Sequence, residues 1–396
     1  MKIALLTLPL HYNYGGNLQC YALVTILKRM GHEVENIKII QDIKLPSISQ
    51  RPYLYSKRLI NKILGRANSY IFTEQKMIRD KDIVHKYSEE FITKYIPQTI
   101  HQYRDATSLE SLNQYKFDAF IVGSDQVWRP KYAFPDLYSN FFSFLKDNKL
   151  PLRISYAASF GTSINEYSEQ EIKKCGSLIR KFDAVSVRED SAIQLIQNQF
   201  HWECPQPQHV LDPTMLLRKE DYLELNLPVI ESKQKKELFY YILDMTPDKK
   251  RSITEICNIC NIKSFTISPQ STYVGSKAEK KTIPPVEEWI QGFNRAKIII
   301  TDSFHGCVFS IIFNKPFIVY ANSKRGIARF HSLLKTFNLE SRLIINSHEL
   351  THTIINSTID WNHINYIWEK KRQESISFLQ NSLNKKTKKT FSSSPK

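Results

Sequence analysis

The fold is decided by residues 2–40, which read KIALLTLPLHYNYGGNLQCYALVTILKRMGHEVENIKII. A short apolar run leads into a polar loop with two glycines, and apolar residues at helical spacing then extend from Leu18 to Met30. Gly31 follows directly, as is common at the end of a helix. A second β-branched run occupies residues 33–40. This order of strand, glycine loop, helix and strand predicts a βαβ unit and therefore a parallel sheet covered by helices.

The same alternation continues along the chain in two series, separated by a polar stretch over residues 218–236. Polar residues collect where the predicted strands end, which is where parallel sheets place their binding sites. Further strands are expected over 117–122, 153–158, 184–187, 209–211, 238–243, 264–267, 297–301 and 317–320, and helices over 169–182, 190–199, 248–261, 285–295 and 305–313.

The pattern predicts an α/β protein with two Rossmann-like domains that face a central cleft. We expect the first domain over residues 1–225 and the second over 237–383. Residues 384–396 are rich in lysine and serine, which predicts a basic flexible tail.

The composition indicates which classes of ligand the protein could bind and in which cellular compartment it could work. The 396 residues include 55 Lys plus Arg against 39 Asp plus Glu, a net charge of +16 that favours phosphorylated metabolites, lipid headgroups or nucleic acid as partners. Six scattered cysteines and an amino-terminal segment without a cleavage site predict free thiols in the cytoplasm. No apolar run approaches the ~20 residues of a membrane-spanning helix.

The segment richest in candidate chemistry is residues 298–310, IIITDSFHGCVFS. Asp302 and Ser303 are favoured residues at a helix start, and His305 and Gly306 fall in the first helical turn. Such a helix start offers unpaired N–H groups to a phosphate or carboxylate, with a titratable imidazole beside them. The alternative is that Asp302 and Ser303 only cap the helix and His305 lies on the surface.

Two charged residues at strand ends have a structural and a functional interpretation each. Arg188 could bind an anion through two hydrogen bonds from its guanidinium, or it could form an ion pair with Glu189 or Asp190. Asp125 could accept a proton from a sugar hydroxyl, or cap its loop.

Two loops are weaker candidates. Gly15, Gly16 and Asn17 do not form a dinucleotide-binding fingerprint, and they mark either a tight turn or a close approach to a ligand. Lys324 and Arg329 follow a predicted strand of the second domain and could close over an anion, or serve solubility.

Two further segments bear on partners and metals. Residues 51–66 alternate basic and apolar residues, which fits either a helix on an anionic lipid surface or a helix packed on the first domain. Residues 348–352, HELTH, match a zinc-protease motif by letter but lie in a polar, turn-rich setting, so we expect no metal site.

Taken together, six motifs in order resemble the polysaccharide pyruvyl transferase family. The resemblance spans about residues 1 to 380 and implies a fold like that of GT-B glycosyltransferases. The motifs are NYGGNLQ at 13–19, FDAFIVGSDQVW at 117–128, YAASFG at 156–161, SVRE at 186–189, LDPT at 211–214 and TDSFHG at 301–306.

The resemblance implies an activity that moves the enolpyruvyl carbon of phosphoenolpyruvate onto two hydroxyls of one sugar, with release of phosphate and no other cofactor. By resemblance, His305 would be the general acid and Arg188 the ligand of the phosphate or carboxylate of phosphoenolpyruvate. Asp125 is our candidate for the base that acts on the acceptor. The remaining expected substrate-binding residues are Asp302, Ser303, Phe304, Gly306, Lys324, Arg329, Gly15, Gly16 and Asn17.

The implied acceptor is a sugar of a capsule or exopolysaccharide precursor, such as a lipid-linked oligosaccharide. A cytoplasmic enzyme with peripheral contact to the inner face of the cell membrane would suit it. The alternative is a GT-B-type glycosyltransferase that uses a nucleotide sugar. A basic nucleic-acid or glycan-binding module is a third class, but the chain has no nucleic-acid motif and we expect no nucleic-acid partner.

Overall fold

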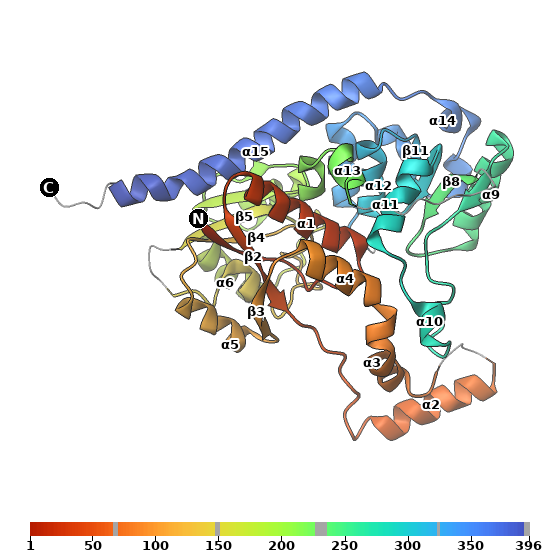
Figure 1. Cartoon of the computed structure of the whole chain (residues 1–396), viewed down its shortest axis with the longest axis horizontal. Coiled ribbons are helices and arrows are strands. Elements are labelled where there is room, and N and C mark those ends of the chain that lie inside the picture. The colour runs from red at the N-terminus through yellow and green to blue at the C-terminus, as the bar shows by residue number, and fades with distance from the viewer. Residues whose placement is uncertain (66–69, 147–150, 226–235, 323–324, 392–396) are drawn as a thin grey trace.

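The computed structural model describes residues 1–65, 70–146, 151–225, 236–322 and 325–391. Two parallel sheets form its centre, and helices cover both (Figure 1). The α/β architecture with two Rossmann-like halves predicted from the sequence is therefore confirmed.

The first sheet has the strand order β3-β2-β1-β4-β5-β6-β7, and every neighbouring pair is parallel. Its central strands read as continuous apolar runs because helices bury both of their faces. The strands are β1 (Lys2–Leu6), β2 (Glu33–Ile39), β3 (Gln98–Tyr103), β4 (Ala119–Val122), β5 (Leu152–Ala158), β6 (Ala184–Val187) and β7 (Gln208–His209).

The second sheet has the order β12-β11-β10-β8-β9 and is also parallel throughout. Its central strand, β10, is buried on both faces. The strands are β8 (Lys236–Tyr241), β9 (Lys263–Phe265), β10 (Ile298–Thr301), β11 (Phe317–Tyr320) and β12 (Leu343–Ile344).

Helices connect the strands of each sheet. Two of them begin at capping side chains that the sequence supplies: the Asn13 side chain accepts from the Gly16 N–H at the start of α1, and the Ser303 side chain accepts from the Gly306 N–H at the start of α12. The helices are α1 (Tyr14–Arg29), α2 (Arg51–Ile63), α3 (Thr73–Val84), α4 (Lys86–Tyr95), α5 (Ala106–Leu109), α6 (Glu169–Ile179), α7 (Asp190–Gln194), α8 (Lys219–Leu223), α9 (Pro247–Cys260), α10 (Ala278–Lys281), α11 (Val286–Arg295), α12 (Phe304–Ile312), α13 (Ala328–Thr336), α14 (His352–Asn356) and α15 (Trp361–Phe391).

The last helix, α15, runs from the second half back across the first (Figure 1). The Trp368 indole N–H donates to the Met215 carbonyl at 2.8 Å, and the Ser375 hydroxyl accepts from the Leu211 N–H at 3.0 Å. We expected the second domain to end at residue 383 and a basic flexible tail to follow. Helix α15 spans both ranges, since it runs from Trp361 to Phe391, and its Leu383 is buried.

Helix α2 lies at the tip of a projection that leaves the body through α3 (Figure 1). It buries none of its residues, so it does not pack on the first domain as one interpretation of its sequence proposed. Within the part of the chain that the structure describes, no helix is long and apolar enough to cross a bilayer.

Candidate active site

The candidate site lies where the carboxyl ends of strands from both sheets face each other. Five loops contribute to it, and they follow β1, β4, β6, β7 and β10. Because all these strands are parallel, residues far apart in sequence arrive at the same edge.

Arg188, directly after β6, is the centre of the site. Its Nη1 donates to Asp212 Oδ2 at 2.8 Å and its Nη2 donates to Asp125 Oδ1 at 2.9 Å. Its side chain is 1% exposed, and its Nε has no hydrogen-bond partner among the described residues. The guanidinium is thus fixed by two carboxylates and keeps N–H groups free for a ligand. The alternative partners Glu189 and Asp190 are engaged elsewhere, with the backbone of Gly161 and with Lys335.

A second guanidinium, that of Arg329 on α13, joins the site from the second half. Its Nη1 lies 3.3 Å from Asp125 Oδ1, and it lies over the Phe304 ring at 5.0 Å, with Arg188 over the same ring at 4.6 Å. Burial opposes ionisation of Asp125, yet the two guanidiniums lower its pKa to about 2. Burial and the nearby Arg188 lower the pKa of Arg329 to about 10. Two cations thus share one ionised carboxylate.

His305, in the first turn of α12, meets the same cluster through Asp212. Its Nε2 lies 3.7 Å from Asp212 Oδ2, which is an ion-pair distance but too long for a hydrogen bond. That nitrogen is buried and has no hydrogen-bond partner among the described residues. Asp212 is buried as well, but His305 and Arg188 outweigh this and hold its pKa well below the ordinary value. The guanidinium of Arg188 and the imidazole of His305 therefore share one anionic partner.

The start of α12 supplies backbone donors beside the imidazole. The Ser303 N–H donates to the Thr301 hydroxyl at 3.1 Å, and the Gly306 N–H donates to the Ser303 hydroxyl at 3.3 Å. The N–H groups of Phe304 and His305 have no such partner within the described ranges. Gly306 is needed here because a Cβ would stand 2.2 Å from the Thr301 hydroxyl oxygen. Ser303 and Gly306 thus shape the helix start, and the next two N–H groups remain available to an anion.

Asp302 has a different environment from its neighbours. Its carboxylate accepts from the Leu243 N–H at 2.6 Å, from the Asp244 N–H at 3.0 Å and from Lys249 Nζ at 2.6 Å. The side chain is fully buried against the second sheet. These contacts tie β10 to the loop after β8 and leave little of the carboxylate for a substrate.

We therefore expect Asp302→Ala to destabilise the protein by about 3 to 5 kcal/mol, the usual cost of breaking a buried ion pair. Chemical denaturation measures this. Lys297→Ala, which removes a lysine paired with Glu237 at an exposed position, is the control and should cost less than about 1 kcal/mol. A folded Asp302→Ala protein with unchanged stability and a raised KM would instead assign Asp302 to the substrate.

The glycine loop after β1 touches His305 directly. A Cβ on Gly15 would stand 2.0 Å from His305 Nδ1, whereas a Cβ on Gly16 would meet only Asn13 at an ordinary 3.6 Å. Asn17 is buried, and its amide donates to the His11 carbonyl at 2.7 Å. Gly15 thus lets the first turn of α1 support the imidazole ring.

This contact gives a matched pair of variants. Gly15→Ala should displace the His305 ring and lower kcat by about 10- to 100-fold, since small misplacements of a catalytic group are costly. Gly16→Ala adds the same methyl one residue later and should leave kcat within about twofold, because helical alanine is well tolerated. Steady-state kinetics on both proteins, with melting curves to confirm folding, make the comparison. Equal effects of the two substitutions would contradict a positioning role for Gly15.

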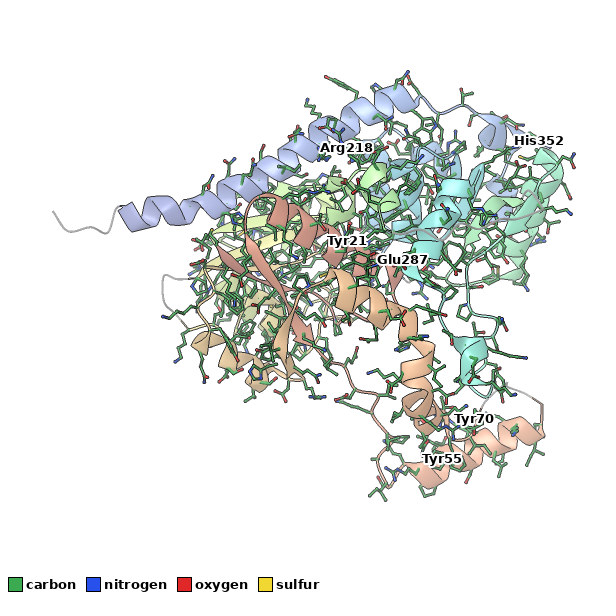
Figure 2. The ribbon with its side chains drawn as sticks, in the orientation of Figure 1. Tyr21, Tyr55, Tyr70, Arg218, Glu287 and His352 are labelled. Atoms are coloured by element: carbon green, nitrogen blue, oxygen red, sulfur yellow. The ribbon has the colours of Figure 1, made fainter. Side chains whose placement is uncertain are left out.

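Lys324 falls outside the described residues. The residues at 348–352 that match the zinc-protease motif by letter do not share one helix. His348 and Glu349 lie in a 3₁₀ turn (Ser347–Glu349), and His352 is the first residue of α14. Figure 2 shows His352 at the outer end of the second half. In the described part of the chain, no group of three or more His, Cys, Asp or Glu could hold a metal ion.

Two residues of the site had no role predicted from the sequence. The first is Asp212, which belongs to the LDPT motif and follows the two-residue strand β7; this position at a strand end could have marked it as a site residue. His11 lies in the loop after β1. Burial and the nearby His85 lower its pKa to about 4, and Asp125 acts on it in the opposite direction. His11 is therefore neutral near pH 7 and within electrostatic reach of the site.

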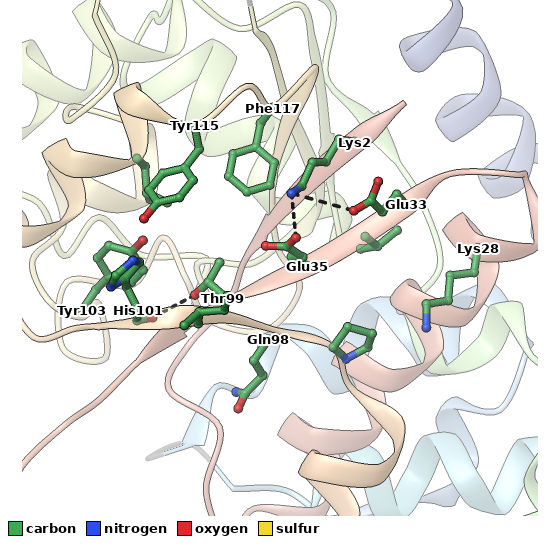
Figure 3. Close-up of a pocket in the computed structure, with 14 residues that line it drawn as sticks. Lys2, Lys28, Glu33, Glu35, Gln98, Thr99, His101, Tyr103, Tyr115 and Phe117 are labelled. Atoms are coloured by element: carbon green, nitrogen blue, oxygen red, sulfur yellow. Dashed lines mark hydrogen bonds and ion pairs between the residues drawn. The ribbon is translucent and has the colours of Figure 1, made fainter.

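Two cavities of similar size lie at the two ends of the first strands. One of about 500 Å³ is lined by His11, Tyr12 and His85, with residues of α3 on its far wall. The His11 and Tyr12 rings stack in its wall at 4.7 Å. Another, of about 470 Å³, opens at the amino ends of the first strands, where Lys2 pairs with Glu35 (Figure 3). Neither cavity is lined by a predicted site residue, but the first is lined by His11 of the loop after β1.

Comparison with known proteins agrees with the fold. The structure is similar to UDP-GlcNAc 2-epimerase from Neisseria meningitidis bound to UDP-GlcNAc, with a TM-score of 0.54 and 10% identity over 97% of this chain and 100% of that one. UDP-N-acetylglucosamine 2-epimerase from Rickettsia bellii has a TM-score of 0.48, with 9% identity over 97% of each chain. A mutant O-GlcNAc transferase from Thermobaculum terrenum has a TM-score of 0.47, with 9% identity over 97% of this chain and 67% of that one. The first of these likenesses, together with the two parallel sheets, shows a GT-B-like fold.

The sequence identifies the family within this fold. Residues 13–324 match the family described as polysaccharide pyruvyl transferase, which is most of the chain. The protein belongs to this family. A comparison with curated proteins gave no match.

Proposed function

We propose that the protein transfers the enolpyruvyl group of phosphoenolpyruvate to two hydroxyls of one sugar, forming a cyclic pyruvate ketal and releasing inorganic phosphate. The observation that supports this most strongly is the joint position of Arg188, Arg329 and His305 at the start of α12. Together with membership of the family, it provides cations and a proton donor beside one another.

The anionic groups of phosphoenolpyruvate would bind to the two guanidiniums and to the free N–H groups of Phe304 and His305. Asp125 and Asp212 hold Arg188 rigidly before the substrate arrives, so little ordering is required on binding. Charge-assisted hydrogen bonds to a phosphate are among the stronger contacts that a protein offers.

The reaction needs an acid at the methylene carbon. Protonated His305 would give its Nε2 proton to that carbon, while Asp212 stabilises the imidazolium beforehand. The central carbon becomes oxocarbenium-like, and one sugar hydroxyl attacks it and loses its proton. The bond to the phosphate oxygen then breaks, the second hydroxyl closes the ring, and its proton leaves with the phosphate.

Asp125 is our candidate for accepting the hydroxyl proton. In the unliganded site its low pKa makes it a poor base, because Arg188 and Arg329 both stabilise its charge. When the substrate anion engages these guanidiniums, Asp125 loses part of that stabilisation and its proton affinity rises. The order of events therefore favours phosphoenolpyruvate before the acceptor.

The cavity of about 500 Å³ beside His11 is our candidate for the acceptor sugar. Its stacked His11 and Tyr12 rings offer a flat apolar face, and polar side chains such as Gln41 and Glu89 complete the lining. Its location next to the loop that contacts His305 would bring sugar hydroxyls toward the reacting carbon.

The test combines binding and turnover. Phosphoenolpyruvate should raise the melting temperature of the purified protein, and UDP-GlcNAc should not. With a panel of methyl hexopyranosides, the protein should release phosphate and produce a glycoside heavier by one pyruvate less one water. A melting shift with UDP-GlcNAc alone, together with glycosyl transfer, would establish the nucleotide-sugar alternative instead.

A further inference from the structure

Helix α2 presents an apolar surface to solvent on the side turned away from the molecule. Its inner side is bound to α3: Arg58 donates to both carboxylate oxygens of Glu74 at 2.7 and 2.8 Å, and the Tyr55 ring packs edge-on against Phe72 at 5.0 Å. Figure 2 shows Tyr55 within this projection. These contacts fix which side of α2 faces outward.

The outward residues are aliphatic or aromatic, and all are strongly exposed. They form what we call the α2 outer face: Tyr53 (68% exposed), Ile60 (54%) and Ile63 (74%), with Leu64 (52%) at the helix end. Isolated exposed apolar residues are ordinary, but four on one side of a helix indicate an interaction surface.

Positive charge surrounds this face. From residue 44 to residue 64 the chain has five basic residues and no acidic one, and of these Arg58 is paired with Glu74 on the inner side. Lys57 and Lys62 are exposed on α2, and the Lys57 ammonium lies over the Tyr53 ring at 5.9 Å. An apolar stripe flanked by lysines complements a surface that has anionic groups above hydrocarbon.

The base of the projection is firmly attached, so α2 is held outward. Lys281 of α10 donates to Asp80 Oδ2 of α3 at 2.7 Å, and the Ile283 N–H donates to the Val84 carbonyl at 3.0 Å. Helix α3 also lines the cavity beside His11. The projection therefore connects its exposed tip to the vicinity of the active site.

We propose that the α2 outer face docks the protein reversibly on a bilayer that contains anionic lipids, with the apolar side chains inserted among the headgroups. Helix α2 lies at the end of the projection, where a broad lipid surface can reach it (Figure 1), and the excess of positive charge favours anionic headgroups. The docking does not depend on which reaction the active site performs.

Co-sedimentation of the full-length protein with vesicles tests this. The protein should bind vesicles of phosphatidylcholine with 30 mol% phosphatidylglycerol at least ~10-fold more strongly than pure phosphatidylcholine, and binding should weaken as salt is raised from about 0.1 to 0.5 M. The double variant Ile60→Asp/Ile63→Asp should lower the partition coefficient on anionic vesicles at least ~10-fold.

The matched control is Ile164→Asp/Ile345→Asp, which makes the same change at two isoleucines that are 72% and 71% exposed away from the projection. It should bind as the wild type does, and melting curves should be the same for both variants. Lipid binding that is equal in the two variants would overturn the proposal. So would a dimer in analytical ultracentrifugation that only Ile60→Asp/Ile63→Asp dissociates, because the face would then belong to a second copy.

Discussion

Arg188→Lys is expected to lower kcat/KM for phosphoenolpyruvate by at least ~100-fold, with a raised KM as well as a lowered kcat. Lysine keeps the positive charge, so one buried carboxylate retains a partner and the protein should fold. It cannot bridge Asp212 and Asp125 at once, because an ammonium lacks the planar fork of a guanidinium. The free Nε donor that we assign to the substrate is also lost.

Arg342→Lys is the control for this experiment. Arg342 is also buried, at 3% exposure, but its guanidinium donates to the Ile354 carbonyl and to Ser357 in the second half, away from the cluster. Its substitution should affect stability and leave kcat/KM within about threefold. If Arg188→Lys is folded and has wild-type kcat/KM, Arg188 does not bind the substrate anion.

The sequence revealed the strands that lie at the centre of each sheet better than those at the edges. Strands such as β4 and β10 are short apolar runs followed by polar residues, and the predicted strands at 117–122 and 297–301 contain them. Strands β3 and β12 were not predicted. β3, QTIHQY, has exposed residues at its centre, and β12 has only two residues, so neither has the apolar run that indicates a buried strand.

The sequence suggested most residues of the candidate site, but not Asp212 or His11, and the contacts among these residues required the fold. Nothing in the spacing of residues 125, 188, 212 and 329 indicates that two guanidiniums share Asp125. Asp302 shows the opposite case. Its place in the TDSFHG motif suggested a ligand contact, whereas the fold turns its carboxylate toward Lys249. Side-chain direction at a strand end depends on the neighbouring loops, which lie elsewhere in the sequence.

His305→Gln is expected to lower kcat by at least ~100-fold while KM for phosphoenolpyruvate changes by less than about threefold. Glutamine has a similar reach and can hydrogen-bond, but it cannot donate a proton to carbon. The backbone N–H groups at the start of α12 remain, so the anion should still bind. This split between kcat and KM separates the acid from Arg188, whose replacement affects both.

The control is His32→Gln. His32 directly precedes β2, at the end of the first sheet opposite the candidate site, and its ring lies near the terminal amine. It should have wild-type kinetics. A double-mutant cycle adds a readout that a purely structural role would not give. If Gly15 acts through the imidazole, then Gly15→Ala should cost almost nothing further in the His305→Gln background. Additive losses would show that Gly15 acts independently, and a folded His305→Gln protein with wild-type kcat would exclude His305 as the acid.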